Sequence, residues 1–440
     1  MAPLELATEE QWQQFDKELA IAKEMGVHGV SVDIWWGKVE KSADNTFDWS
    51  YYHKLAELLR KHQLQWIPIM SFHQCGGNVG DNCNIPIPNW IWTHFEGVSQ
   101  EELMFKSEQG NYARETLAIW HEPSVSNQVY AQYREFMHAF ETEFADFADE
   151  IQEINISMGS AGELRYPSYN GHDENTGYPT RGALQAFSEA ALEKYREYLS
   201  TKFASIEDLN ASWNREYAGF SSISPSQVEL EHAFAHAMHH QAGPIRDFID
   251  WYHHSLIMHG EKMLSTGDAA LQGAFSNIPL GFKIPGIHWQ MSVQGGMRRS
   301  AEIAAGLIPF QPYSIDNHFG YSSILTMAQQ FATSTQRPLI VHFTALEMDN
   351  NTEAPAYSRA KTLVAWLGQA AHAKGLTIKG ENALAAGVHH KAGWQHIDTA
   401  LREHHYSGLT VLRLGDVTSN PVGHKEYTRL ISSFHKTKAK

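Results

Sequence analysis

Two stretches of sequence decide the fold: VHGVSVDIWW, residues 27–36, and LQWIPIMSFH, residues 64–73. Both are short and mainly apolar, and the β-branched Val and Ile among them favour strands. Residues 50–63 and residues 9–25 carry apolar side chains at a spacing of three to four, which is the pattern of an amphipathic helix. Gly26 ends the helix predicted at residues 9–25. Helices that alternate with strands in this way predict parallel strands joined by helices.

The same alternation continues along the chain. We predict further strands and helices, the strands at 153–159, 271–278, 338–346, 376–380 and 409–414, and the helices at 128–147, 181–202, 228–264 and 424–436. No G-x-G-x-x-G follows the first strand, so a Rossmann fold lacks its fingerprint. An α/β fold of the (β/α)₈ TIM-barrel type with long βα loops fits better. No break in composition divides the chain, so we expect one domain over residues 1–440.

Composition and charge narrow the class of protein. The net charge of −16 argues against a nucleic-acid partner, which would need clustered Lys and Arg. No apolar run is long enough to span a membrane, so we expect no membrane partner. The first 25 residues hold acidic side chains where a signal peptide needs an apolar core. A neutral sugar polymer remains compatible, because the 13 Trp include enough rings to cover the apolar faces of sugars.

Polar side chains stand where the predicted strands end. Barrel enzymes carry their chemistry at these carboxyl ends, and the residues there are Asp33, His73, Glu163, Lys283, His288, Thr344, Glu381 and Arg413. Glu163 and Glu381 are the candidates for an acid and base pair, since glycoside hydrolysis needs two carboxylates. The pattern alone leaves open that each glutamate caps a helix or pairs with a neighbour such as Arg165.

A glycine-rich segment, GGNVGD at residues 76–81, follows the second predicted strand. Its glycines permit a mobile turn, so it is either a lid that closes over a substrate or an ordinary surface loop. Cys75 and Cys83 flank this segment. They are either reduced thiols or a disulfide that closes a short loop.

Seven strings of sequence resemble the β-amylases of glycoside hydrolase family 14, and they occur in the family's order over nearly the whole chain. They are VDIWWG (32–37), HQCGGNVGD (73–81), AGELRYPSY (161–169), GFKIPGIHWQ (281–290), FTALEM (343–348), GENAL (380–384) and LRLGD (412–416). The spacing of Cys75 and Cys83 and the NIPIP that follows are closer to the bacterial than to the plant branch of the family.

The resemblance implies a role for each matched residue. Glu163 matches the general acid and Glu381 the general base, and residues 76–81 match the lid. The positions that match substrate contacts are Asp33, His73, Asp81, Lys283, His288, Thr344, Asn382, Ala383 and Arg413. Family members invert the anomeric centre and release β-maltose from the non-reducing ends of α-1,4-glucans, and no cofactor is required. The alternatives are a non-catalytic glucan sensor on the same scaffold and a barrel glycosidase of another linkage preference.

The chain departs from the family pattern at several positions. Ala345 stands where many members have cysteine, and Ser160 stands where a proline is common. Some bacterial members bind a structural calcium ion. The residues that match its ligands are Glu40, Asp44 and Glu135, but Gln132 replaces a further helix glutamate, and the loss of a charge weakens a hard-cation site.

The resemblance also gives expectations about the whole protein. No starch-binding domain follows LRLGD and its helix, so raw granular starch should be a poorer substrate than soluble starch. We expect a monomer. The resemblance favours an extracellular enzyme, although the chain as given starts at MAPL with no signal peptide.

Overall fold

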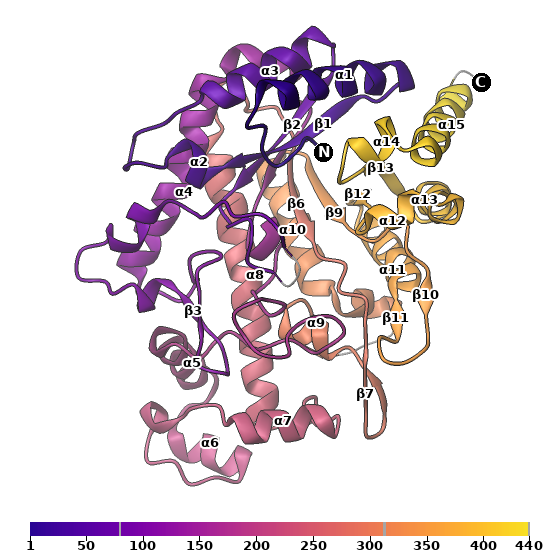
Figure 1. The fold of residues 1–440 in the computed structure, drawn as a ribbon. Helices are drawn as coiled ribbons and strands as arrows, with labels where there is room; N and C mark the ends of the chain where they lie inside the picture. The colour runs from indigo at the N-terminus through magenta and orange to yellow at the C-terminus, as the bar shows by residue number, and fades with distance from the viewer. Residues whose placement is uncertain (79–80, 311–313, 439–440) are drawn as a thin grey trace.

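The structure is a computed structural model that describes residues 1–78, 81–310 and 314–438. Seven parallel strands form its main sheet, in the order β1-β2-β5-β6-β9-β12-β13 (Figure 1). Their bounds are β1 Gly29–Trp35, β2 Gln65–Ser71, β5 Ile154–Ile156, β6 Leu280–Ile284, β9 Leu339–Phe343, β12 Thr377–Glu381 and β13 Tyr406–Thr410. The order of the strands in the sheet is the same as their order in the chain. Every connection therefore runs the same way around the sheet.

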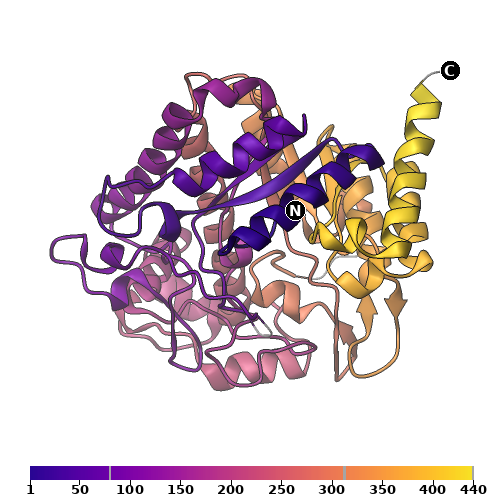
Figure 2. The same cartoon turned by 45° about the horizontal axis from the view of Figure 1, so that its top comes forward.

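Helices follow the strands and cover the outside of the sheet (Figures 1 and 2). The longer ones are α1 Glu9–Met25, α3 Ser50–Lys61, α4 Pro123–Glu143, α5 Glu189–Lys202, α6 Ile206–Trp213, α7 Gln227–Ala235, α8 Pro244–Ala270, α10 Ser322–Thr335, α11 Ala360–Ala373, α13 Lys391–Glu403 and α15 Pro421–Lys438. Short helices and two-stranded ribbons lie in the loops: α2 Trp36–Val39, α9 Ser300–Ala304, α12 Ala385–Val388, α14 Gly415–Thr418, β3–β4 (Phe105–Lys106, Tyr112–Ala113), β7–β8 (Met291–Val293, Gly296–Arg298) and β10–β11 (Asn350–Asn351, Ser358–Arg359). None of the described helices is long and apolar enough to cross a membrane.

The first residues of the chain join the two edges of the sheet. The Ala2 amide donates to the Ser31 carbonyl of β1 at 2.9 Å, and the Leu414 amide, after β13, donates to the Met1 carbonyl at 3.2 Å. Helix α1 packs against α14 and α15, so the indigo and yellow ends of the chain lie side by side in Figures 1 and 2. The curled sheet therefore closes around an interior, which confirms the predicted barrel-type α/β fold.

Six predicted strands overlap observed ones, but the strand predicted at 271–278 is wrong. Those residues form turns, and β6 begins at Leu280. Leu271 and Phe275 lie in these turns and are nevertheless buried. Their apolar side chains gave the segment the sequence pattern of a strand. Lys283 consequently lies on the strand itself rather than in a turn after it.

The bounds of several predicted helices also differ from the observed ones, and two differ most. The helix predicted at 181–202 begins only at Glu189, after the Ser188 side chain caps its first turn. The helix predicted at 228–264 is two helices: α7 ends at Ala235, two residues before Ala237 at φ +55°, and α8 begins at Pro244, after Gly243 at φ +140°. The predicted strand at 409–414 begins earlier, at Tyr406.

Candidate active site

Glu381 is the last residue of β12, and its side chain points to a buried lysine. The Lys283 ammonium, on β6, donates to Glu381 Oε1 at 2.6 Å. Glu381 is 3% exposed and Lys283 is 9% exposed. Burial acts to lower the pKa of Lys283, but the Glu381 carboxylate outweighs it and holds that pKa above its ordinary value. The pair is therefore a buried carboxylate held beside a permanent positive charge.

Glu163 follows a short turn, Ser160–Gly162, beyond β5. Its side chain is 16% exposed, and Arg165 Nε donates to its Oε2 at 2.9 Å. Burial raises the pKa of Glu163, while Arg165 and Lys283 oppose that rise. The pairing with Arg165 that the sequence left open is thus present. With this pairing in place, the pKa of Glu163 still lies above its ordinary value.

The backbone brings the two glutamates to one place. Glu163 forms a parallel β-bridge with Lys283, and the Leu164 amide donates to the Lys283 carbonyl at 2.8 Å. Lys283 thus adjoins Glu163 through its backbone and Glu381 through its side chain. Residues 218 positions apart in the chain therefore face one group of side chains, as their strand ends predicted.

Asp33 and His73 stand on neighbouring strand ends. Asp33 accepts from the Ser71 hydroxyl at 2.8 Å, and burial raises its pKa. His73 Nδ1 is 2.9 Å from the Ser157 hydroxyl. Burial, together with the charges of nearby lysine and arginine, lowers the pKa of His73 to about 3. His73 is therefore a neutral ring with one nitrogen left for another partner.

His288 and Thr344 lie in the next loops. The Gly286 amide donates to the Thr344 hydroxyl at 2.8 Å, which joins the loop after β6 to the loop after β9. His288 Nδ1 is 2.7 Å from the Ser358 hydroxyl, and burial lowers the pKa of His288 to about 4. Among the described residues His288 makes no hydrogen bond to either glutamate.

Asn382 and Ala383 directly follow Glu381, and their loop is held from two sides. The Leu412 amide donates to Asn382 Oδ1 at 2.8 Å. The Ala383 amide donates to the Glu347 carboxylate, at 3.1 and 3.0 Å to its two oxygens. Our sequence reasoning missed Glu347. Its position inside the FTALEM string was the available signal.

Arg413 is exposed and stands beyond the end of β13. Burial lowers the pKa of the Met1 amino group to about 5. The charges that also act on this amino group are those of Glu381, Lys283, Arg413 and Asp33. Arg413 therefore lies in the same group of charges as three other predicted site residues. The structure therefore brings Arg413 into the neighbourhood of the buried pair.

The glycine-rich segment is closed by a disulfide between Cys75 and Cys83, with an S–S distance of 1.98 Å. Of the predicted lid at 76–81, residues 79 and 80 lie outside the described residues. Asp81 is exposed, and its carboxylate accepts from the Gly77 and Asn78 amides at 3.2 and 3.1 Å. Asp81 thus shapes the turn itself, and it makes no hydrogen bond to either glutamate within the described chain.

The three residues that match calcium ligands come together. One oxygen from each of Glu40, Asp44 and Glu135 lies within 4.8 Å of the others. Asp44 Oδ1, Glu135 Oε1 and the nearby Gln132 Oε1 are buried atoms without hydrogen-bond partners in the described chain. Burial raises the pKa of Glu40 to about 7. Buried oxygens without donors fit a hard cation.

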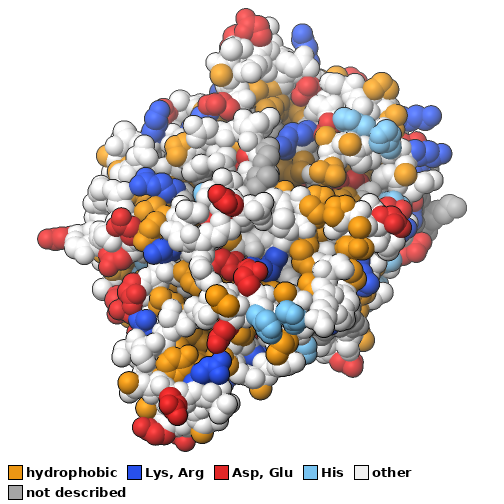
Figure 3. Space-filling view, turned by 60° about the horizontal axis from the view of Figure 1, so that its bottom comes forward, with side chains coloured by type: hydrophobic (Ala, Val, Ile, Leu, Met, Phe, Trp, Pro, Cys, Tyr) orange, Lys and Arg blue, Asp and Glu red, His pale blue; other side chains and the backbone are white. Residues whose placement is uncertain are grey.

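The face seen in Figure 3 carries mixed charges: Lys and Arg side chains lie scattered among Asp and Glu side chains rather than in one basic patch.

A curled parallel sheet whose strand ends carry two glutamates beside one buried lysine has the parts of a glycoside hydrolase barrel.

The comparisons with known proteins agree with that class. A family model described as Glycosyl hydrolase family 14 matches residues 1–438. The thermophilic β-amylase of Thermoanaerobacterium thermosulfurigenes is 36% identical over 422 residues, covering 96% of this chain and 70% of that protein. The β-amylase of Niallia circulans is 35% identical over 424 residues, covering 96% and 67%.

Solved structures give the same result. The crystal structure of the catalytic domain of the β-amylase from Paenibacillus polymyxa has a TM-score of 0.82 and 32% identity, and covers 98% of this chain and 96% of that one. The chain therefore belongs to glycosyl hydrolase family 14 and is a glycoside hydrolase of the β-amylase type. The predicted likeness to bacterial members is confirmed as well.

Proposed function

We propose that this enzyme hydrolyses the α-1,4 bonds of starch and maltooligosaccharides from their non-reducing ends and releases β-maltose with inversion. The observation that carries the proposal is the pair of glutamates on either side of Lys283, which have different surroundings. Relatives that bear the name β-amylase support the starch-type substrate.

The different surroundings suit two different roles. Glu163 acts as general acid, because burial raises its pKa and favours the protonated form that can donate to the leaving oxygen. Glu381 acts as general base, because the Lys283 ammonium at 2.6 Å stabilises its ionised form. Inversion needs a water molecule between sugar and base, so the mechanism calls for carboxyls about 6.5–9.5 Å apart.

Neutral polar groups around the pair bind the sugar hydroxyls. Burial lowers the pKa values of His73 and His288 to about 3 and about 4, so both rings are uncharged near neutral pH and can donate or accept. The other residues that we assign to substrate binding are Asp33, Asp81, Lys283, Thr344, Asn382, Ala383 and Arg413. The lid at 76–81 closes one end of the pocket, which suits exo action.

The anomer of the first product tests the proposal. Maltoheptaose incubated with the enzyme and followed by proton NMR should give β-maltose first, before mutarotation. First release of α-maltose would refute inversion, and random internal cleavage would refute exo action. No turnover together with glucan binding would favour the non-catalytic sensor, which the retention of both glutamates and of their lysine argues against.

We also propose that Glu40, Asp44 and Glu135 hold a structural calcium ion, supported by their partnerless buried oxygens. Addition of Ca²⁺ after chelation should raise the melting temperature, because a ligand that binds only the folded state stabilises it. Glu135→Gln should abolish that increase. An equal response of both proteins to Ca²⁺ would contradict the site.

A further inference from the structure

One arginine is shared between the proposed general acid and the lid. Arg165 Nε donates to Glu163 Oε2 at 2.9 Å, and Arg165 Nη2 donates to Asn78 Oδ1. The Arg165 side chain is 5% exposed, so water cannot readily replace either acceptor. A displacement of Asn78 therefore changes how the guanidinium group is divided between the lid and the acid.

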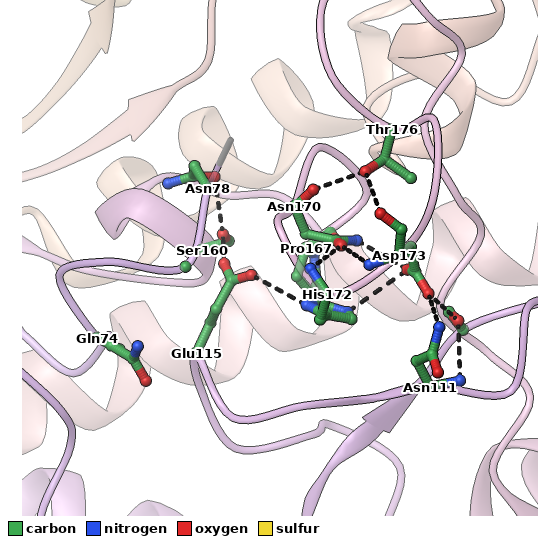
Figure 4. A network of polar contacts seen from close by, with 12 residues as sticks. Gln74, Asn78, Asn111, Glu115, Ser160, Pro167, Asn170, His172, Asp173 and Thr176 are labelled. Atoms are coloured by element: carbon green, nitrogen blue, oxygen red, sulfur yellow. Dashed lines mark hydrogen bonds and ion pairs between the residues drawn. The ribbon is translucent and has the colours of Figure 1, made fainter. Parts of the chain in front are cut away.

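Asn78 is in turn held by a second contact from the acid loop. The Ser160 hydroxyl lies 3.4 Å from Asn78 Oδ1 and donates to the Glu115 carboxylate. Figure 4 shows Asn78, Ser160 and Glu115 pointing toward one another. Ser160 stands three residues before Glu163 in the same loop. Asn78 is thus joined to the loop of the proposed acid by Ser160 as well as by Arg165.

The lid turn rests directly on Glu115. A Cβ atom on Gly77 would lie 2.1 Å from Glu115 Cγ, so only glycine lets the turn approach this closely. Glu115 is 3% exposed, and its Oε1 has no hydrogen-bond partner in the described chain. The Gly171 amide fixes the turn from the other side by donating to the Gly77 carbonyl at 3.0 Å. The residue before Asn78 is therefore fixed by close packing against Glu115 and by the hydrogen bond from Gly171.

We propose that Asn78 and Ser160 are positioning residues that link the turn at residues 76–78 to the proton on Glu163, with Arg165 as the connection. This inference rests on the proposed role of Glu163 as general acid. While Asn78 occupies one arm of Arg165, the guanidinium neutralises the Glu163 carboxylate less fully, and Glu163 keeps its proton to higher pH. The position of Asn78 thereby sets the pH range in which the acid is ready to donate.

The charges that face these groups define what the link can change. Glu163 faces Arg165, Lys283 and Glu381, and of these only Arg165 contacts the lid. The groups that face Glu115 are Arg165, Asp81, Asp173 and His172. A change at Asn78 therefore reaches Glu163 through Arg165, while Lys283 and Glu381 remain in place.

Two substitutions at Asn78 should have opposite effects. In Asn78→Ala the freed arm of Arg165 turns to Glu163, and the pKa of Glu163 falls by about one unit. In Asn78→Asp the new carboxylate competes for Arg165, and the pKa of Glu163 rises by a similar amount. Ser160→Ala, which removes the support of Asn78, should shift the pKa in the direction of Asn78→Ala.

The matched controls are Asn82→Ala and Asn82→Asp. Asn82 lies in the same disulfide-closed loop and is exposed, and it has no hydrogen bond to Arg165 in the described chain. These controls make the same changes of size and charge without touching the arginine. The pKa of Glu163 should therefore be the same in both of them as in the parent enzyme.

Two readouts follow the pKa of Glu163. The first is the basic limb of the pH profile of kcat/KM on maltoheptaose. The second is ¹³C NMR of labelled glutamate carboxyls, with the Glu163 signal assigned from Glu163→Gln, which needs no turnover. Failure of the parent enzyme to release maltose would reject the proposed function, and the NMR titration would still decide the link.

Opposite shifts in the two Asn78 variants, with the Asn82 variants unchanged, support the proposal. Shifts of the same sign, shifts equal to those of the Asn82 variants, or no shift overturn it. If the Asn78 variants do not fold, Ser160→Ala decides: a lowered pKa supports the link, and an unchanged pKa rejects it.

Discussion

The Lys283 ammonium lies 2.6 Å from Glu381 Oε1, in a pair so buried that neither side chain is more than 11% exposed. A carboxylate this deep is expensive to bury without an oppositely charged partner, and Lys283 supplies that partner. We therefore propose that Lys283 holds the Glu381 carboxylate in place, in addition to its proposed contact with substrate.

Lys283→Met should lower kcat/KM by at least about 100-fold, because it removes the ammonium that donates to Glu381 Oε1 and leaves a buried carboxylate without that partner. The conservative Lys283→Arg should restore part of the activity, because the guanidinium can still donate to the carboxylate. A rise in KM with kcat unchanged would mean that Lys283 only binds substrate.

Glu163→Gln should abolish turnover on soluble starch and leave the affinity for maltose within about threefold, because the amide cannot donate a proton but fills the same space. In the parent enzyme the raised pKa means that activity persists above pH 4.5 and is lost as the pH rises through the pKa of Glu163. Calorimetric titration with maltose checks binding. Turnover close to that of the parent enzyme would exclude Glu163 as the acid.

The sequence predicts some parts of this site and not others, for physical reasons. Strands that contain a continuous apolar run, such as residues 66–70 of β2, are readable because burial on both faces demands such runs. The segment at 271–278 misled us, because buried turns use the same residues. Contacts such as Arg165 with Asn78 and Glu347 with Ala383 join residues far apart in the chain, and they depend on how the loops fold over one another, which no local pattern encodes.

Gly162→Ala should reduce activity by about tenfold or more. Gly162 has φ +77°, and an added Cβ would lie 2.9 Å from Cε1 of His73. The backbone conformation alone costs about 1 kcal/mol for a residue other than glycine, and the clash also displaces His73. Gly110→Ala is the control, since Gly110 has φ +88° but nothing within 4 Å of its Cβ position. It should lose stability without loss of kcat. Equal losses of kcat in both variants would argue against a role for His73 placement.

Thiol reagents should not inactivate the parent enzyme, because its two cysteines are joined in a disulfide and Ala345 replaces the cysteine common in the family. Ala345→Cys should make activity sensitive to N-ethylmaleimide, since Ala345 is buried directly beside Thr344, which we propose to bind substrate. Ala373→Cys, on the exposed end of α11, should be labelled with activity retained. If fully labelled Ala345→Cys kept the activity of the parent enzyme, this loop would have no role in substrate binding.

Glu153 makes the stability of the barrel depend on acid pH. It is fully buried, its Oε1 contacts His342 Nε2, and Lys379 donates to its Oε2 at 2.6 Å. Burial acts to raise the pKa of Glu153, but His342 and Lys379 together lower it to about 2. Because the folded pKa lies below the unfolded value of about 4.5, the stabilisation is complete above pH 4.5 and is lost as the pH falls toward 2.

Glu153→Gln should therefore unfold more easily than the parent enzyme at pH 7, by about 3 kcal/mol, and the difference should shrink to nothing near pH 2. Glu150→Gln is the control, because Glu150 pairs with Arg60 at the surface, with 28% of its side chain exposed, and such pairs contribute about 1 kcal/mol or less. Urea unfolding followed by tryptophan fluorescence at pH 7, 4 and 2.5 measures both. A difference between Glu153→Gln and parent that stays constant over this range would show that the carboxylate charge is not what stabilises the barrel, and that the loss comes from packing alone.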